Sequence, residues 1–219
     1  MIEHRTTSCS AFGQREISLS LKAESGLDPS WLIAYFESEV RAGRRFQPEE
    51  TVQIGWMIVM LRPNAAGELE VWEPQFDSLP IQWTKGVNNT LRHLVIQKSV
   101  CEQFGCEPDF PSLRQAGVVA KRFLEGTQTF AMSRDEASNN DSGWGFFVPN
   151  EPIGAGDGEF RSLFEISFYH VEIIPFLAMP AGATITKSSD AVEVTFNERT
   201  LSSKTNELLH KISQSPVLV

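Results

Sequence analysis

The sequence predicts an α+β protein of two sequential modules, each a small, mainly antiparallel sheet with one or two packed helices. The 219 residues are 41% hydrophobic and include 15 Phe and 5 Trp, which is enough apolar surface for packed cores. Segments with strand-like alternation and segments with helical periodicity follow one another along the chain. Two prolines in four residues, Pro108 and Pro111, interrupt this pattern. We therefore expect modules at residues 1–110 and 111–219.

The N-terminal module begins with a strand and a helix. Apolar and polar residues alternate over 16–22, as in a half-buried strand. Asp28 and Pro29 are typical of a helix N-terminus, helical spacing continues over 29–42, and Gly43 is a suitable stop. The residues before this strand show no regular pattern.

The rest of this module is predicted to contain a hairpin and a long helix. Residues 52–61 are rich in β-branched and aromatic side chains and end at a turn-forming sequence. This pattern predicts one buried strand that pairs with 68–72. After a loop at 74–80, helical periodicity covers 87–104 and ends before Gly105.

The C-terminal module alternates short apolar segments with polar loops and shows no internal repeat. We expect strands at 117–119, 127–132 and 144–148, exposed loops at 133–142 and 151–159, a helix at 160–169, a hairpin of 183–186 with 191–196, and a last helix at 205–212.

Charge and hydropathy restrict the partners and the compartment. The formal net charge of −9 would repel a phosphate backbone, so nucleic acid is not an expected ligand. The N-terminal residues do not form a secretory signal, and the longest apolar stretch, 54–61, is too short to span a membrane. We expect a cytoplasmic protein without a membrane-spanning segment.

The sequence contains no pattern typical of a catalytic or cofactor site. The four histidines are scattered without metal-ligand spacing. The glycine-rich segment 154–158 lacks the Lys-Ser/Thr of a phosphate-binding loop, and Cys101 and Cys106 do not have the spacing of a redox motif. We therefore predict a protein that is not an enzyme and that needs neither a metal nor a cofactor.

Carboxylates concentrate between residues 133 and 165, a segment that contains seven acidic residues and two arginines. These acids are Asp135, Glu136, Asp141, Glu151, Asp157, Glu159 and Glu165. Such a surface would steer a basic partner and speed its encounter with the protein. The alternative is a solvated face that only keeps the protein soluble.

Three aromatic residues, Trp144, Phe146 and Phe147, follow this acidic loop. They are the residue types that dominate binding energy when a partner covers them, and they are equally suited to a core. Strand alternation predicts that Phe146 and Phe147 point to opposite faces.

Two stretches resemble a family of bacterial toxin-immunity proteins, the one numbered thirty-three and formerly a domain of unknown function. Residues 133–136 (SRDE) and 140–147 (NDSGWGFF) look like the family's acidic loop leading into a Ser-Gly-Trp strand. Residues 173–182 (IIPFLAMPAG) are similar to its closing Ile-Ile-Pro segment. The similarity covers about 112–196, and the stretch 148–159 is an insert relative to shorter members.

The N-terminal half resembles a companion region of longer family members. The residues that carry this likeness are 76–83, 88–94 and 108–114. None of these motifs is catalytic, so the resemblance implies a role and no reaction.

The resemblance implies a protein that binds and neutralises a cognate toxin, such as a type VI secretion effector, by occluding it. A nuclease would suit the acidic surface, because an inhibitor covers the site that normally receives phosphates. The expected partner-binding residues are Asp135, Glu136, Asp141, Trp144, Glu151, Asp157 and Glu159. The rival hypothesis is a hydrolase or a small-molecule sensor with a pocket between the modules, using His93, Glu165 or His170. The oligomeric state is left open.

Overall fold

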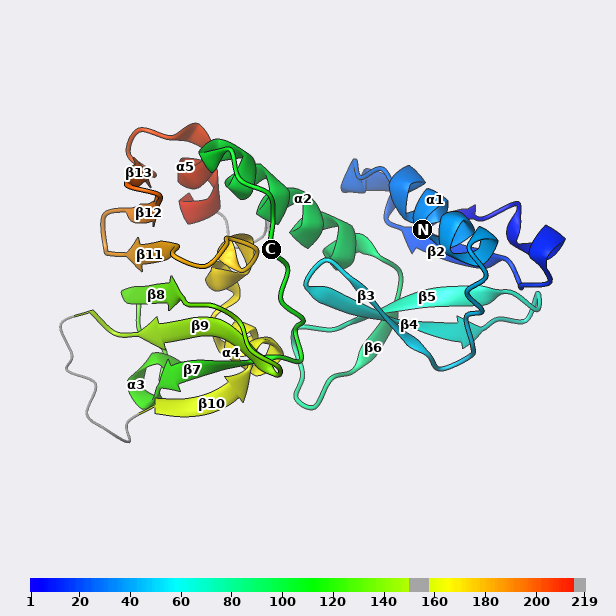
Figure 1. The fold of residues 1–219 in the computed structure, drawn as a ribbon, viewed down its shortest axis with the longest axis horizontal. Helices are drawn as coiled ribbons and strands as arrows, with labels where there is room; N and C mark the ends of the chain where they lie inside the picture. The colour runs from blue at the N-terminus through cyan, green and yellow to red at the C-terminus, as the bar shows by residue number, and fades with distance from the viewer. Residues whose placement is uncertain (150–157, 215–219) are drawn as a thin grey trace. The chain divides into compact units, whose positions relative to one another are not determined.

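The computed structural model describes residues 1–149 and 158–214. Its contacts divide the chain into two units, Met1–Arg92 and His93–Val219, and helix α2 (Asn88–Phe104) begins in the first and continues in the second. Each unit contains a mainly antiparallel sheet with packed helices, which confirms the α+β prediction (Figure 1). The predicted boundary near residue 110 refers to modules that fold separately. It stays a prediction.

Unit 1 is a mixed sheet of six strands. The order is β1-β2-β5-β4-β3, with β6 paired to β5. Only β2 and β5 pair in parallel. The strands are β1 (Ile2–Arg5), β2 (Ile17–Leu21), β3 (Thr51–Ile54), β4 (Met57–Pro63), β5 (Leu69–Pro74) and β6 (Trp83–Lys85), and the helices that precede α2 are η1 (Cys9–Phe12), η2 (Ala23–Ser25) and α1 (Ser30–Arg41).

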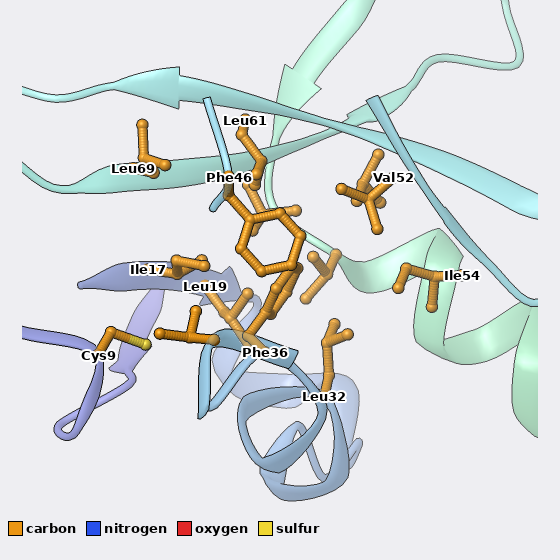
Figure 2. Close-up of a cluster of buried hydrophobic side chains, with 14 of the residues drawn as sticks. Cys9, Ile17, Leu19, Leu32, Phe36, Phe46, Val52, Ile54, Leu61 and Leu69 are labelled. Atoms are coloured by element: carbon orange, nitrogen blue, oxygen red, sulfur yellow. The ribbon is translucent and has the colours of Figure 1, made fainter. Parts of the chain in front are cut away.

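Helix α1 holds the core of unit 1 together. Its buried side chains, Leu32, Phe36 and Val40, recur at helical spacing and pack among buried residues of the sheet such as Leu19 (Figure 2). The Phe36 ring meets the Phe46 ring edge-on, with 5.2 Å between centroids. Asp28 Oδ1 accepts a hydrogen bond of 2.9 Å from the Ser30 N–H, as expected for a residue before a helix.

Four features of unit 1 differ in detail from the predictions. The expected strand 52–61 is a hairpin, because Gly55 (φ 60°) turns the chain between β3 and β4. The patternless start contains the edge strand β1, and the loop at 74–80 leads into another unpredicted strand, β6. Strand β2 is buried on both faces, since even its serines are covered.

Unit 2 is a seven-stranded sheet in the order β10-β7-β9-β8-β11-β12-β13, which can be followed in Figure 1. All pairs are antiparallel except β7 with β9. The strands are β7 (Ala116–Ala120), β8 (Phe130–Arg134), β9 (Asp141–Phe147), β10 (Gly158–Ser162), β11 (Thr184–Lys187), β12 (Val192–Phe196) and β13 (Arg199–Ser202), and the helices that follow α2 are α3 (Lys121–Leu124), α4 (Leu163–Tyr169), η3 (Val171–Phe176) and α5 (Glu207–Gln214).

One face of this sheet, the inner face, carries the core of unit 2. Buried residues alternate with partly exposed ones along β7 and β8, as on a sheet covered on one side. Phe123 of α3 packs on Phe130 and Phe146 of this face, with ring centroids 5.7 and 5.5 Å apart. The predicted hairpin of 183–196 and the last helix are confirmed as β11, β12 and α5.

The predicted helix at 160–169 was wrong in its first turn. Phe160 lies in strand β10, where it pairs with Val118, and α4 begins only at Leu163. The Ser162 Oγ accepts a hydrogen bond of 3.1 Å from the Glu165 N–H, and this cap fixes the start of the helix. Strand β13 was not predicted.

A buried arginine, Arg134, joins separate segments of unit 2. Its Nη1 donates to the carbonyls of Asp109 (2.6 Å) and Met179 (2.7 Å), and its Nε donates to that of Ser142 (3.2 Å). The Asp109 carboxylate lies 3.1 Å from Nη2. Burial lowers the pKa of Arg134, and the nearby Asp109 charge partly offsets this effect. These hydrogen bonds are what make burial of this cation tolerable.

A second polar group lies between α4, η3 and β11. His170 is buried, its Nε2 lies against the Phe123 carbonyl, and its Nδ1 is 3.5 Å from Glu172 Oε1. The same Glu172 oxygen is 3.3 Å from Lys187 Nζ. Burial raises the pKa of Glu172, but the hydrogen bonds from His170 and the backbone and the charge of Lys187 outweigh it and lower this pKa to about 2.

We predict that Arg134→Met destabilises the protein strongly, because it leaves three inward-facing carbonyls without their donor. The free energy of unfolding should fall by about 3 kcal/mol or more. Arg199→Met is the matched control, since Arg199 is exposed and only stacks over Phe104; its effect should stay below about 1 kcal/mol. Urea denaturation of both variants measures the difference, and equal losses would contradict a central role for Arg134.

We predict that Glu172→Gln lowers stability at neutral pH and not in acid. The folded-state pKa is about 2, below the ordinary value of 4.5, so the carboxylate stabilises the fold above about pH 4.5 and loses this effect as the pH falls. The loss should be on the order of 2 kcal/mol at neutral pH. The measurement is the free energy of unfolding of wild type, Glu172→Gln and the exposed control Glu193→Gln, taken by denaturation in acid and at neutral pH. A difference that does not shrink in acid would refute the stabilising ion pair.

Candidate functional site

The second face of the unit 2 sheet, which we call the outer face, carries a continuous row of residues. Five residues lie opposite one another on successive strands from β10 to β11, in the order Phe160, Val118, Gly145, Ser133 and Thr184. Because cross-strand partners point to the same side, all five belong to this face. The helix residue Phe123 packs on inner-face residues, on the other side of the sheet.

A shallow hollow of about 280 Å³ opens on the outer face over β7, β8 and β9. It is lined by Val118, Ser133, Asp135, Glu136, Asp141, Gly143, Trp144, Gly145 and Phe147. The structure thus brings four predicted site residues to one place, the acids Asp135, Glu136 and Asp141 and the aromatic residue Trp144.

Two glycines of β9 contribute to the hollow because they have no side chain to fill it. Gly143 has a φ of 78°, and a Cβ there would collide with the Asp135 carbonyl. At Gly145 a Cβ would collide with the Phe147 ring. Gly143 is therefore required for the backbone to approach Asp135, and Gly145 leaves room for the Phe147 ring to lie over the strand.

Backbone hydrogen bonds position two of the three acids, Asp135 and Asp141. The Asp135 N–H donates to the Gly143 carbonyl at 2.9 Å, and Asp141 Oδ1 accepts the Gly143 N–H at 2.9 Å. Asp135 and Glu136 are exposed, and Asp141 is half-buried. Within residues 1–149 and 158–214, the salt bridges of lysine and arginine do not include Asp135, Glu136 or Asp141. Their negative charges therefore face solvent.

Charged residues of the strands divide between the two faces. At strand positions, the outer face carries Asp141 and Glu193. The basic strand residues all have cross-strand partners on the inner face; they are Arg134, Arg161, Lys187 and Arg199. The charged strand positions of the outer face are therefore acidic.

The predicted site residues other than the three acids differ from them in charge compensation or burial. Glu159 forms an ion pair with Arg161 and lies 3.9 Å from Lys121 Nζ, so its charge is compensated. Trp144 is 1% exposed and its indole N–H donates to the Leu177 carbonyl at 3.0 Å. Trp144 therefore borders the hollow from a buried position in the core, and its role as an anchor for a partner stays a prediction. Glu151 and Asp157 lie outside the described residues.

The two phenylalanines after Trp144 follow the predicted alternation. Phe146 is fully buried in the inner face, and Phe147 is half-buried on the outer face. Phe160 is not among the predicted site residues, because the sequence predicts a loop end and the start of a helix at residues 158–162. In residues 158–162 (GEFRS), the uncharged residues alternate with the charged residues Glu159 and Arg161. This two-residue period is the signal that could have indicated a strand.

The residues named for the enzymatic alternative are buried or already paired. His93 is buried, Glu165 pairs with Arg161 at 3.6 Å, and His170 belongs to the buried group with Glu172. No cluster of three potential metal ligands occurs within the described residues. A second hollow, of about 240 Å³, is lined mainly by apolar side chains with Glu172 and Lys187, which already form an ion pair. In the described part of the chain, no helix is long and apolar enough to cross a membrane.

Comparison with known proteins gave one match. The model of the Imm33-like domain matches residues 96–198, all within unit 2. No curated protein and no solved structure matches the chain. The match includes the motifs at 133–136, 140–147 and 173–182, whereas the resemblance of residues 76–83, 88–94 and 108–114 to a companion region stays a prediction.

The matched motifs meet around two buried side chains. Arg134 bonds to the carbonyls of Ser142 and Met179, and Trp144 bonds to that of Leu177. These contacts give the motifs a structural reason that is independent of any reaction. The match of the Imm33-like domain to residues 96–198 is consistent with the resemblance to the thirty-third family of bacterial immunity proteins.

Proposed function

We propose that this protein is an immunity protein that binds a cognate bacterial toxin and neutralises it by occluding it. The observation that carries the proposal is the Imm33-like domain, whose name indicates an immunity role. The family motifs support it further, because they build the frame of the sheet around Arg134 and leave the outer face available for a partner. The protein would act by binding and not by catalysis.

The acidic hollow supports a basic toxin as the partner. Three carboxylates that form no salt bridge with the described residues lie around one depression in a chain with a net charge of −9. Such a field speeds the encounter with a positively charged surface and disfavours wrong partners. A nuclease fits this description, because its active site attracts phosphates. The proposed setting is the cytoplasm, and the toxin would be a type VI secretion effector.

Co-expression tests the function directly. The product of the gene adjacent to that of this protein is expressed in cells with and without the full chain, and cell growth is measured. We expect rescue of growth together with co-purification of the two proteins. Absence of both binding and rescue would refute the proposed function.

Charge reversal tests the acidic site. Asp135→Lys with Glu136→Lys should weaken toxin binding by about tenfold or more, mainly through a slower association, because the steering field is lost. Thermal unfolding should hardly change, since both side chains are exposed. The control is Asp190→Lys, an equally acidic and exposed residue in the turn between β11 and β12. Surface plasmon resonance at low and high salt measures the effect. If the double variant binds the toxin as tightly as Asp190→Lys does, the acidic hollow is not part of the binding surface.

A further inference from the structure

The outer face of unit 2 has an apolar end beside its acidic hollow. Phe160 on the edge strand β10 is 67% exposed and lies directly opposite Val118, which also lines the hollow. On the other side of Val118, Phe147 lies against Gly145 of β9. An apolar surface of several residues therefore adjoins the three acids, whereas single exposed apolar residues would need no explanation.

This apolar end is not required for the core. The core of unit 2 lies on the inner face, where Phe146 and Val119 are fully buried. The outer-face partners of the same strands, Val118 and Phe147, are only half-buried. Leaving a phenyl ring such as Phe160 in water costs free energy that a partner would recover by covering it.

We propose that the outer face over β10, β7, β9 and β8 is the surface on which the toxin docks, with Phe160 as its apolar anchor. This inference rests on the proposed function and specifies the surface and the chemistry of the partner. The partner is a basic protein surface with an apolar centre. Its centre covers Phe160 and Val118, and its lysine or arginine side chains lie against Asp135, Glu136 and Asp141.

Charge complementarity selects this occupant over a second copy of the same chain. A symmetric dimer through this face would bring the two acidic hollows towards each other, and like charges at an interface are destabilising. A basic protein surface instead compensates the acids, while the apolar anchor supplies affinity that does not depend on salt.

The test uses the full chain and the protein encoded by the adjacent gene. Phe160→Ala and Ser133→Arg each change the outer face, the first by removing the anchor and the second by placing a bulky cation in the lining of the hollow, next to Gly145. Tyr169→Ala is the matched control, because Tyr169 is an exposed aromatic residue (49%) on helix α4. Calorimetry gives the Kd of each variant, thermal unfolding checks the fold, and light scattering gives the mass of the free protein.

We expect Phe160→Ala and Ser133→Arg to weaken binding by about tenfold or more, and Tyr169→Ala to bind as the wild type does. If the wild type binds and both outer-face variants bind equally well, the docking surface is refuted while the proposed function stands. If the wild type neither binds nor rescues, the proposed function itself fails. A free dimer that only the outer-face variants dissociate, with toxin binding unchanged, would assign the face to self-association and overturn the inference.

Discussion

The buried guanidinium of Arg134 is the interaction on which unit 2 depends. A cation in a protein interior must have hydrogen-bond acceptors, and here carbonyls of three segments distant in sequence provide them. The segment before β7, the start of β9 and the turn before β11 are thereby fixed around the end of β8. Trp144 extends the same junction, because its indole N–H satisfies the carbonyl of Leu177.

The two-residue period of a strand separates this structural role from binding. In β8 and β9, Arg134, Trp144 and Phe146 point inward, whereas Ser133 and Gly145 belong to the outer face. A single stretch of sequence therefore contains both the motif that builds the domain and the surface that we propose for the toxin. This arrangement explains why a short family motif can lack catalytic residues.

Local patterns were sufficient to predict the fold class and most elements, because α1, α2 and the hairpin of β11 and β12 have clear periodicity and turns. They failed where the outcome depends on distant contacts. Burial of Arg134 is decided by carbonyls that only the folded chain brings together, and Trp144 is suited equally to a core and to an interface. Of the predicted acids, Asp135, Glu136 and Asp141 do meet at one hollow, but composition could not show that Arg161 compensates Glu159.

The separation of the two faces also has an energetic consequence for how such a domain can change. An inward substitution at Arg134 or Trp144 leaves buried polar groups without partners and threatens the fold, whose total stability is small. A substitution at an exposed position such as Phe160 or Asp135 has little effect on folding and acts on the surface that a partner would meet. The outer face can therefore adapt to a different toxin while the junction around Arg134 stays the same, and specificity can be altered without loss of the fold.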